Sequence, residues 1–573
     1  MSTLDWIILV VTLLGIIAYG LYKSRTTHDL DGYFLSNRSM PWWLVLLSIM
    51  GTQASAITFL SAPGQAYTDG MRFVQYYFGL PLAMVVICIS FVPLFSRLKV
   101  YTAYEFLEQR FDVETRTLTS SLFLLQRGLS TGISIFAPSI ILASLLGWNI
   151  YWTNLFMGGL LIIYTVTGGA RAVAYTQQLQ FVIIFAGMFL AGYYVVHHLP
   201  ANIGFADSLS ISGKLGKLNV ITTGMKKGSF DWGDRYNIIS GVIGGFFLAL
   251  SYFGTDQSQV GRYLTASSVK QSRIGLLMNG IVKVPMQFTI LLIGILVFTF
   301  YQFNKAPVFF NQTEIARLEK SEYRDSLHVI QQQGLAVQTE KEAVLQRYAE
   351  LHAAIHLDTL KQLQGKTDAL RTQMKSLVKK NGGDDNDTNY IFLRFVMDYL
   401  PVGLVGLLIA IIFLASWGSI AAALNSLASC TVVDFHKKFI VKKETNEDDY
   451  RISKLYTLGW GVFSIIVSMF AYNIGNSLIE AVNILGSLFY GTILGIFLVA
   501  FWCKKVGGKA VFIAALIVEM GVIIMFILTQ KHIINVAFLW LNVVGALGVV
   551  LVSLLLQSFM KGHKKAPTVS AGA

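Results

Sequence analysis

Long apolar runs separated by short polar segments dominate the chain. The runs occupy 4–22, 42–62, 75–96, 118–146, 150–166, 177–196, 237–254, 274–301, 400–424, 454–473, 479–502, 510–529 and 535–557. A helix needs about 20 apolar residues to cross the hydrocarbon core of a bilayer. The pattern therefore predicts an all-α polytopic protein of the cell membrane, with about 13 transmembrane helices.

The first run is expected to remain in the protein as a helix. No basic segment precedes it and no small-residue cleavage site follows it, whereas Lys23 and Arg25 come directly after it. A signal peptide has the opposite arrangement. Because basic residues favour the cytoplasmic side, we predict the N-terminus outside and, after an odd number of spans, the C-terminus inside.

The distribution of charge supports this topology. The 45 Lys and Arg against 32 Asp and Glu give a net charge of +13. The short intervals expected outside, 147–149 and 474–478, contain no Lys or Arg, whereas Lys504 and Lys505 lie in an interval expected inside. The basic excess therefore indicates orientation in the bilayer rather than a nucleic-acid partner.

Residues 303–393 differ in kind from the rest of the chain. This stretch is charged and rich in Gln, and it shows helical spacing in EIARLEKSEYRDSLHVIQQQ and EKEAVLQRYAELHAAIHLDTLKQLQ. We predict two or three amphipathic helices that form an external cap. A partner-binding or gating role is one interpretation, but a tolerated loop insertion is favoured.

The second run, 42–62, has an unusual polar centre. Gly51-Thr52-Gln53-Ala54-Ser55 lies at the depth where a lipid-facing helix would carry Leu or Ile, and Pro63-Gly64 is expected to close the segment. Irregular backbone inside a membrane occurs only where it lines a cavity or is buried in protein. Transporters use such broken helices to hold cations through freed carbonyls. A small-residue packing face is the alternative.

A second stretch, 413–434, carries a stripe of small residues. Ala415, Gly418, Ser419 and Ala422 follow the i, i+3, i+4, i+7 spacing of one helical face. Such a stripe permits close approach of another helix, and Ser419 adds a hydroxyl oxygen. The three cysteines, Cys88, Cys430 and Cys503, have no metal or redox spacing, and no transition-metal site is expected.

Taken together, motifs along most of the chain resemble the sodium:solute symporter family. They are WW…S..G.Q.SA..F near 42–59, YEFLEQRF at 104–111, TGISIFAPSI at 131–140, TGGARAVAYTQQLQ at 167–180, YFGTDQSQVGRYL at 252–264, LPVGLVGLLIA at 400–410 and LNSLASCTVVDF at 424–435. This family includes sodium–glucose, proline, sialic acid, iodide, multivitamin and monocarboxylate transporters. The forms TGISIFAP and YEFLEQRF look most like the iodide, vitamin and monocarboxylate branch.

The resemblance implies the inverted five-plus-five helix repeat of the leucine-transporter type. One repeat would span 42–196 and the other 237–502, interrupted by the 303–393 insertion. An extra helix at 1–24 would precede them, and two helices with a basic cytoplasmic tail at 503–573 would follow.

The resemblance also implies a sodium site between the broken helix and the small-residue stripe. Gly51, Ala54 and Ala415 would give carbonyls and Ser419 a hydroxyl. Gly418 replaces a second hydroxyl that the family often has, and Gln177 replaces an acid found in some relatives. Ala422 also lacks a hydroxyl, so we predict one sodium per solute.

By the same resemblance, sugar-binding relatives point to a substrate site. The corresponding positions are Gln53, Thr58, Tyr77, Tyr252, Lys283 and Asn483, with Tyr252 as inner gate. Lys283 and Arg127 are cations within apolar runs, where charge is costly and often functional. Lys283 could instead snorkel, Arg127 could face the cytoplasmic vestibule, and Gln53 and Asn483 could be ordinary interhelical hydrogen bonders. Two cations in one cavity would favour an anionic solute.

These features predict a sodium-coupled symporter that imports a small organic solute by alternating access, with Na⁺ as the coupling ion. An organic anion (a monocarboxylate, sialic acid or vitamin-like acid) is favoured, and a neutral sugar is the alternative. A solute-sensing receptor on the same fold is more remote. No nucleophile elbow, phosphate loop or paired metal ligands indicate an enzyme. The identity of the solute, the possible replacement of sodium by protons and the oligomeric state stay open.

Overall fold

The computed structural model describes residues 1–573 except 25–33, 352–353, 441–445, 472–476 and 561–573. Within these described ranges, ten helices are long and apolar enough to cross a membrane, or eleven if the bent pair α3 and α4 is one span. Two shorter apolar helices cover Ile150–Val166 and Ser240–Gly254. An all-α polytopic protein is thus confirmed, while the number 13 stays a prediction.

The first half of the chain contains the broken helix. Its elements are α1 (Thr3–Ser24), η1 (Ser36–Arg38), α3 (Trp42–Gln53), α4 (Ala56–Asp69), η2 (Met71–Tyr77), α5 (Leu80–Leu98), α6 (Glu105–Arg110), α7 (Val113–Leu146), α8 (Ile150–His197), α9 (Phe205–Lys214), β1 (Met225–Lys226) and β2 (Ser229–Phe230). The two short strands pair antiparallel.

The second half begins after this hairpin. Its elements are η3 (Ser240–Gly244), α10 (Gly245–Gly254), α11 (Gln257–Tyr263), α12 (Val269–Phe303), α13 (Gln312–Leu318), α14 (Arg324–Leu351), α15 (Ala354–Lys380), α16 (Thr388–Tyr399), α17 (Leu404–Cys430), η4 (Thr431–Ile440), α18 (Asn446–Phe470), α19 (Leu478–Trp502), α20 (Gly508–Gln530) and α21 (Leu539–Phe559).

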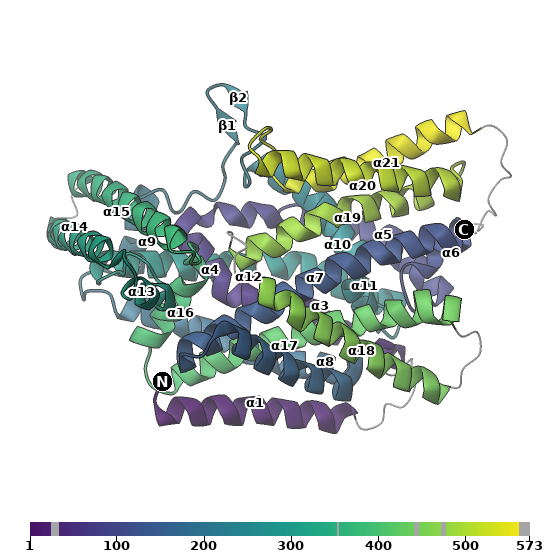
Figure 1. The fold of residues 1–573 in the computed structure, drawn as a ribbon, viewed down its shortest axis with the longest axis horizontal. Helices are drawn as coiled ribbons and strands as arrows, with labels where there is room; N and C mark the ends of the chain where they lie inside the picture. Colours follow the sequence, from purple (N-terminus) through teal and green to yellow (C-terminus); the bar gives the residue numbers. More distant parts are fainter. Residues whose placement is uncertain (25–33, 352–353, 441–445, 472–476, 561–573) are drawn as a thin grey trace.

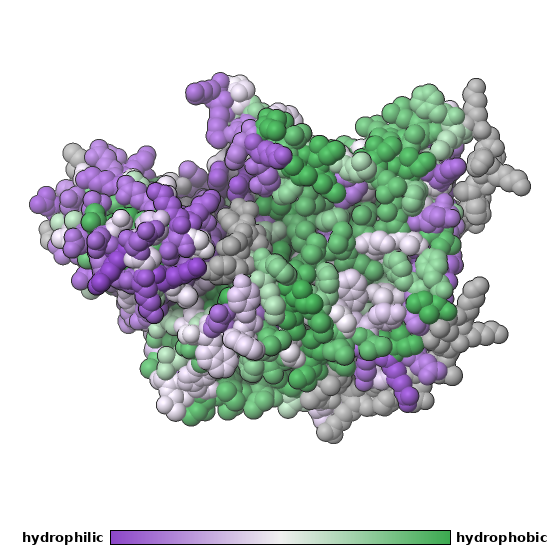
Figure 2. All heavy atoms as spheres, viewed as in Figure 1, coloured by the Kyte–Doolittle hydropathy of each residue, from purple (hydrophilic) through white to green (hydrophobic). Residues whose placement is uncertain are grey.

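An apolar belt covers the middle of the face shown in Figure 2. Figure 2 shows hydrophobic residues over the long helices and a polar mass at the end formed by α13, α14 and α15. The chain begins at that same end, and α21 finishes at the opposite one (Figure 1). Apolar surface of this kind is what lipid tails cover. The assignment of the two ends to outside and inside stays a prediction.

The predicted break in the second span is present. α3 and α4 meet at an angle of 62°, with Ser55 in an extended conformation between them. Pro63 and Gly64, expected to close the segment, lie instead inside α4, which continues to Asp69. Gly64 is needed there because a Cβ atom would lie 1.9 Å from the Thr388 carbonyl oxygen of α16. Tertiary packing, not helix termination, accounts for this glycine.

Helix α8 contains two of the predicted spans, 150–166 and 177–196. It covers Ile150–His197, yet the hydroxyls of Tyr164 and Thr176 lie 2.7 Å apart. Twelve residues of a straight helix rise about 18 Å, which is more than the two side chains can bridge. Ile150–Val166 and Val173–His197 are therefore two separate legs rather than one straight helix.

The 303–393 stretch forms helices α13, α14 and α15, in line with the prediction of two or three. The last two are antiparallel neighbours with an apolar seam that includes Leu327, Met374 and Val378. A second cluster joins Leu345 and Leu360 to Ile211 of α9. Amphipathic faces of two helices thus bury each other, and the unit rests on the rest of the chain through α9.

Candidate functional site

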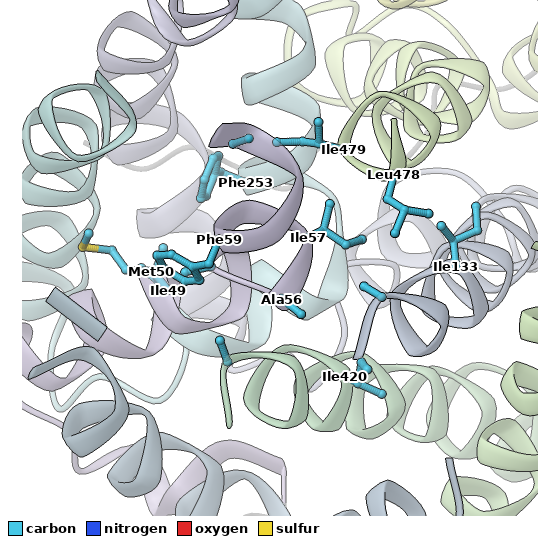
Figure 3. Close-up of a cluster of buried hydrophobic side chains, with 14 of the residues drawn as sticks. Ile49, Met50, Ala56, Ile57, Phe59, Ile133, Phe253, Ile420, Leu478 and Ile479 are labelled. Carbon is cyan, nitrogen blue, oxygen red and sulfur yellow. The ribbon is translucent and has the colours of Figure 1, made fainter. Parts of the chain in front are cut away.

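A cavity with an empty volume of about 1060 Å³ lies at the break between α3 and α4. The rest of its lining comes from η2, α5, α7, α10, α12, α17 and α19. Figure 3 shows the apolar side chains around the break, including Ile57 after it and Phe253, Ile420 and Ile479 on neighbouring helices. These four also line the cavity. A mostly apolar pocket with a few convergent polar groups is the usual form of a small-molecule site.

Every side chain predicted for the substrate site lines this cavity. They are Gln53, Thr58, Tyr77, Arg127, Tyr252, Lys283 and Asn483. They come from α3, α4, η2, α7, α10, α12 and α19, and 430 residues of sequence separate Gln53 from Asn483. The structure thus brings the predicted set together.

Lys283 is a cation of the cavity that has no counter-charge among the described residues. It lies on α12 and is 2% exposed. In the described part of the chain its ammonium has no ion pair, and its one recorded contact is the Tyr77 ring, 5.6 Å away at the centroid. An ammonium buried without a counter-charge is unfavourable. Its position favours an anionic ligand.

Arg127, by contrast, has a counter-charge. Its Nη1 lies 3.7 Å from Oδ2 of Asp256, and its guanidinium lies 5.9 Å from the centroid of the Tyr252 ring. Asp256 also accepts a hydrogen bond of 2.7 Å from the Tyr490 hydroxyl. It accepts another of 2.8 Å from the backbone N–H of Ser258, which caps α11. Asp256 therefore both caps α11 and pairs with Arg127.

Tyr252 contacts the same ion pair, and we call Tyr252, Arg127 and Asp256 the floor of the cavity. The role of Tyr252 as a gate stays a prediction. Its hydroxyl accepts a 2.7 Å hydrogen bond from Nε2 of Gln259, and its ring lies 5.8 Å from that of Tyr490. Tyr490 was not predicted from the sequence. An aromatic residue inside an apolar run gives no signal of its own, and the Asp256 contact identifies it only in the folded chain.

The neutral polar residues are held by the protein itself. Gln53 donates a 3.0 Å hydrogen bond to Oδ1 of Asn279, and Thr58 donates one of 3.3 Å to the Gln53 carbonyl. Asn483 accepts one of 3.1 Å from the Tyr76 hydroxyl, while its own Nδ2 is buried without an acceptor. Tyr76 is a second lining residue that the sequence analysis missed.

The predicted sodium residues surround the helix break. Ser55 donates its N–H to the Gln53 carbonyl at 3.0 Å, so the Gly51 carbonyl does not receive the i+4 bond of a continuous helix. Ser419 lines the cavity and donates to the Ser416 carbonyl at 3.0 Å. Gly51, Ala54 and Ala415 are buried on α3, at the break and on α17, and α17 packs against α3. Freed carbonyls and a hydroxyl are suitable donors for a hard cation.

The two departures from the family pattern, Gln177 and Gly418, are in contact. Nε2 of Gln177 donates to the Gly418 carbonyl at 3.2 Å, and its Oε1 accepts from the Ser48 hydroxyl at 3.2 Å. A Cβ atom at Gly418 would lie 3.2 Å from Cγ of Gln177 and 2.9 Å from Oε1 of Gln180. A neutral amide thus fills the space beside the stripe. Among the described residues, no three His, Cys, Asp or Glu side chains form a metal-binding group.

Comparison with known proteins agrees with this arrangement. The family model of the sodium:solute symporter family matches residues 33–323 and 372–518. The unmatched internal segment, 324–371, comprises α14 and the first part of α15. This segment is shorter than the stretch set apart in the sequence.

Individual relatives match over long stretches. The chain is 25% identical to the sodium/sialic acid symporter of Aliivibrio fischeri, over 98% of this chain and 94% of that protein. It is 30% identical to the human sodium/iodide cotransporter over 47% of this chain and 41% of that protein.

A solved structure shares the fold. It is the substrate-bound, outward-open state of a sodium-coupled sialic acid symporter, with a TM-score of 0.75 and 21% identity, and the match covers 98% of this chain and 99% of that one. On the family match, with the helical fold and the cavity at the broken helix, the chain belongs to the sodium:solute symporter family, whose members are membrane transporters.

Proposed function

We propose that this protein is a sodium-coupled symporter for a small organic anion, and that Lys283 holds the anion's carboxylate. The observation that carries the proposal is the contrast between the two cations of the cavity. Asp256 neutralises Arg127, whereas Lys283 has no acidic partner among the described residues. A carboxylate in the cavity supplies the charge that Lys283 lacks.

The relatives support the same class of solute. Proteins matching nearly the full length of the chain are described as sodium/sialic acid symporters. Sialic acid has a carboxylate and several hydroxyls. The carboxylate would contact Lys283, and the hydroxyls would contact Gln53, Thr58 and Asn483. Tyr77 and Tyr252 would enclose the apolar parts of the ring.

Sodium would bind at the helix break, through the carbonyls of Gly51, Ala54 and Ala415 and the hydroxyl of Ser419. The break in helical hydrogen bonding at Ser55, and the packing of α17 against α3 and α4, support this site. Its occupancy ties α3 and α4 to α17 and so shapes the adjoining cavity. The inward sodium gradient and the membrane potential then drive uptake, the latter by about 2.3 kcal/mol per charge per 100 mV.

The mechanism implies a topology and a repeat. We propose 13 spans with the N-terminus outside, two inverted repeats at 42–196 and 237–502, and the α14–α15 hairpin as an external cap. The position of the first residue and of α14 and α15 at one end of the apolar belt supports this orientation (Figure 1).

A neutral sugar is the second candidate. Tyr76 and Tyr77 are an aromatic pair whose rings lie 4.8 Å apart, and Gln53 and Asn483 are neutral partners for hydroxyls. A sugar, however, would leave the charge of Lys283 uncompensated. This favours the anion.

Uptake into proteoliposomes tests the proposal. Purified protein would face an inward gradient of sodium, potassium or protons, with labelled sialic acid, lactate, biotin, glucose, galactose and proline as solutes. We expect accumulation of an acid with sodium alone, and its loss in Ser419→Ala. Uptake that is indifferent to sodium would contradict the coupling, and accumulation of a sugar would leave coupling intact but remove the role of Lys283.

Substitution of Lys283 gives the sharper test of the solute class. Lys283→Met keeps the length of the side chain and removes its charge, and Lys283→Arg keeps the charge. Since truncating one partner of a buried charge pair costs about 2–5 kcal/mol, the dissociation constant for the acid should rise about 30-fold or more in Lys283→Met, and less in Lys283→Arg. Lys509→Met, an exposed lysine on α20, is the matched control. Equal affinity in Lys283→Met and wild type would contradict the proposed contact.

A further inference from the structure

A second buried cation lies beyond the floor of the cavity, on the short helix α11. Arg262 is 3% exposed, and its Nε and Nη1 atoms are buried without any hydrogen-bond partner. Among the described residues, no carboxylate forms an ion pair with Arg262. The charge of Arg127 repels that of Arg262. Like Lys283, Arg262 is therefore a buried cation without a counter-anion among the described residues.

Two other buried polar residues, one on α11 and one on the neighbouring helix α17, also have atoms without hydrogen-bond partners. Gln259 is fully buried, and while its Nε2 donates to the Tyr252 hydroxyl at 2.7 Å, its Oε1 has no partner. Gln259 and Arg262 are three residues apart on α11 and so lie on the same helical face. On α17, which packs against α11, both side-chain amide atoms of Asn425 are also buried without partners. Buried polar groups are normally satisfied.

These polar groups thus follow one another in space, from the cavity to α11. Lys283 faces the cavity, Tyr252 and Arg127 form its floor with Asp256, and Gln259 connects the Tyr252 hydroxyl to the face that carries Arg262. A path out of the cavity past Tyr252 and along this face of α11 would lead to Gln259 and then Arg262. In the proposed topology this is the cytoplasmic direction.

We propose that Arg262, with Gln259, is a second carboxylate site that receives the organic anion after it passes Tyr252 and before it is released. The inference rests on the proposed function, because the ligand is the transported anion itself. A planar guanidinium can bind a carboxylate through two parallel hydrogen bonds. The unpartnered Nε and Nη1 atoms of Arg262 are suitable donors for such a contact. Binding there would lower the barrier to release from the Lys283 site.

The test compares Arg262→Gln and Arg262→Lys with Lys270→Gln, which removes an exposed cation nearby in sequence. Wild-type protein must first bind and accumulate one of the labelled acids N-acetylneuraminate, lactate or biotin in sodium, and that acid is then used throughout. Failure with all three would reject the proposed function itself. Equilibrium binding in detergent and the rate of uptake into proteoliposomes are then measured for each variant, together with its thermal unfolding temperature.

We expect Arg262→Gln to keep the equilibrium affinity within about twofold of wild type, because Arg262 lies outside the cavity lining. A tenfold change in affinity would correspond to about 1.4 kcal/mol. Its uptake rate should fall at least tenfold. Arg262→Lys should recover part of the rate, and Lys270→Gln should match wild type. A wild-type rate in Arg262→Gln, or parallel loss of affinity and unfolding temperature, would overturn the proposal.

A further readout separates contact with the anion from a structural role in the gate. Gluconate is a carboxylate that does not cross the bilayer, so it can replace chloride inside the vesicles. If carboxylates bind at Arg262, internal gluconate slows uptake by the wild type and has little effect on Arg262→Gln. Equal slowing in both proteins would contradict a carboxylate site at Arg262.

Discussion

At the scale of single residues, Gly51 packs closely against Gln177. A Cβ atom at Gly51 would lie 2.7 Å from Cδ, 2.8 Å from Cγ and 3.0 Å from Cβ of Gln177. These distances are too short for any side chain other than hydrogen. Gly51 thus sets how closely α3 approaches α8, and with it the position of a carbonyl proposed to bind sodium.

We therefore expect Gly51→Ala to lower both stability and sodium affinity. Overpacking of this kind costs about 1–3 kcal/mol, and the displaced carbonyl should raise the sodium dissociation constant about tenfold. Gln177→Ala removes the two closest contacts, so the double variant should recover in part. Thermal unfolding with and without sodium measures both effects.

Gly159→Ala is the matched control, because it lies on α8 and nothing is within 4 Å of its added Cβ. If Gly51→Ala behaved like Gly159→Ala, the packing argument would fail. The same result would remove the reason for linking Gln177 to the sodium site.

At the scale of elements, the loop between α15 and α16 joins the cap to the membrane helices. Asp387 accepts hydrogen bonds from Arg371 of α15 at 2.8 and 3.0 Å and one from the backbone N–H of Phe310 at 2.9 Å. Arg371 also lies over the rings of Phe310 and Tyr67. Tyr67 belongs to α4, so the insertion touches the far end of the broken helix.

The same loop has a pH-sensitive group. Burial, followed by the nearby acids Asp385, Glu314 and Asp387, raises the pKa of Asp384 to about 7, against about 3.9 for an exposed Asp. The folded cap therefore binds this proton more tightly than the unfolded one. Its stability is greatest below about pH 4 with respect to this group and falls as the pH rises to about 7.

We expect Asp384→Asn to remove this dependence. Hydrogen exchange of α14 and α15 measured at pH 5.5 and 8 should show weaker protection at pH 8 in the wild type and equal protection in the variant. Asp358→Asn, on the exposed face of α15, serves as control. Equal pH dependence in wild type and Asp384→Asn would show that another group titrates.

At the scale of the whole molecule, the two proposed sites share the break between α3 and α4. Thr52 and Gln53 from α3 and Thr58 from α4 line the cavity together with Ser419. Any ion that fixes the break also fixes these side chains. Sodium and solute are thus expected to bind with positive coupling.

This coupling must be reciprocal. The factor by which saturating sodium tightens solute binding should equal the factor by which saturating solute tightens sodium binding. Isothermal titration in both orders measures the two factors. We also expect one sodium per solute in paired flux measurements, because the neutral Gln177 amide fills the space beside Gly418. A ratio of two would contradict this.

The sequence by itself determined the class of protein, the break and the candidate site. Apolar runs, the polar centre at Gly51–Ser55 and the family motifs depend on local pattern, and each of the predicted substrate residues lines the cavity. Other features depended on contacts between distant segments. Hydropathy alone does not predict that Asp256 pairs with Arg127, that Gln177 packs against Gly51, or that Tyr164 and Thr176 of α8 are in contact.

The tertiary structure decided which charge is free. Lys283 and Arg127 look alike in sequence, as cations within apolar runs, but folding brings Asp256 to one and no acid to the other among the described residues. Arg262 gave no signal before folding, because its unmet hydrogen bonds exist only once α11 is buried. A charge that water stabilises at the surface needs a counter-charge once it is buried, since the low dielectric of the interior makes an unpaired ion costly.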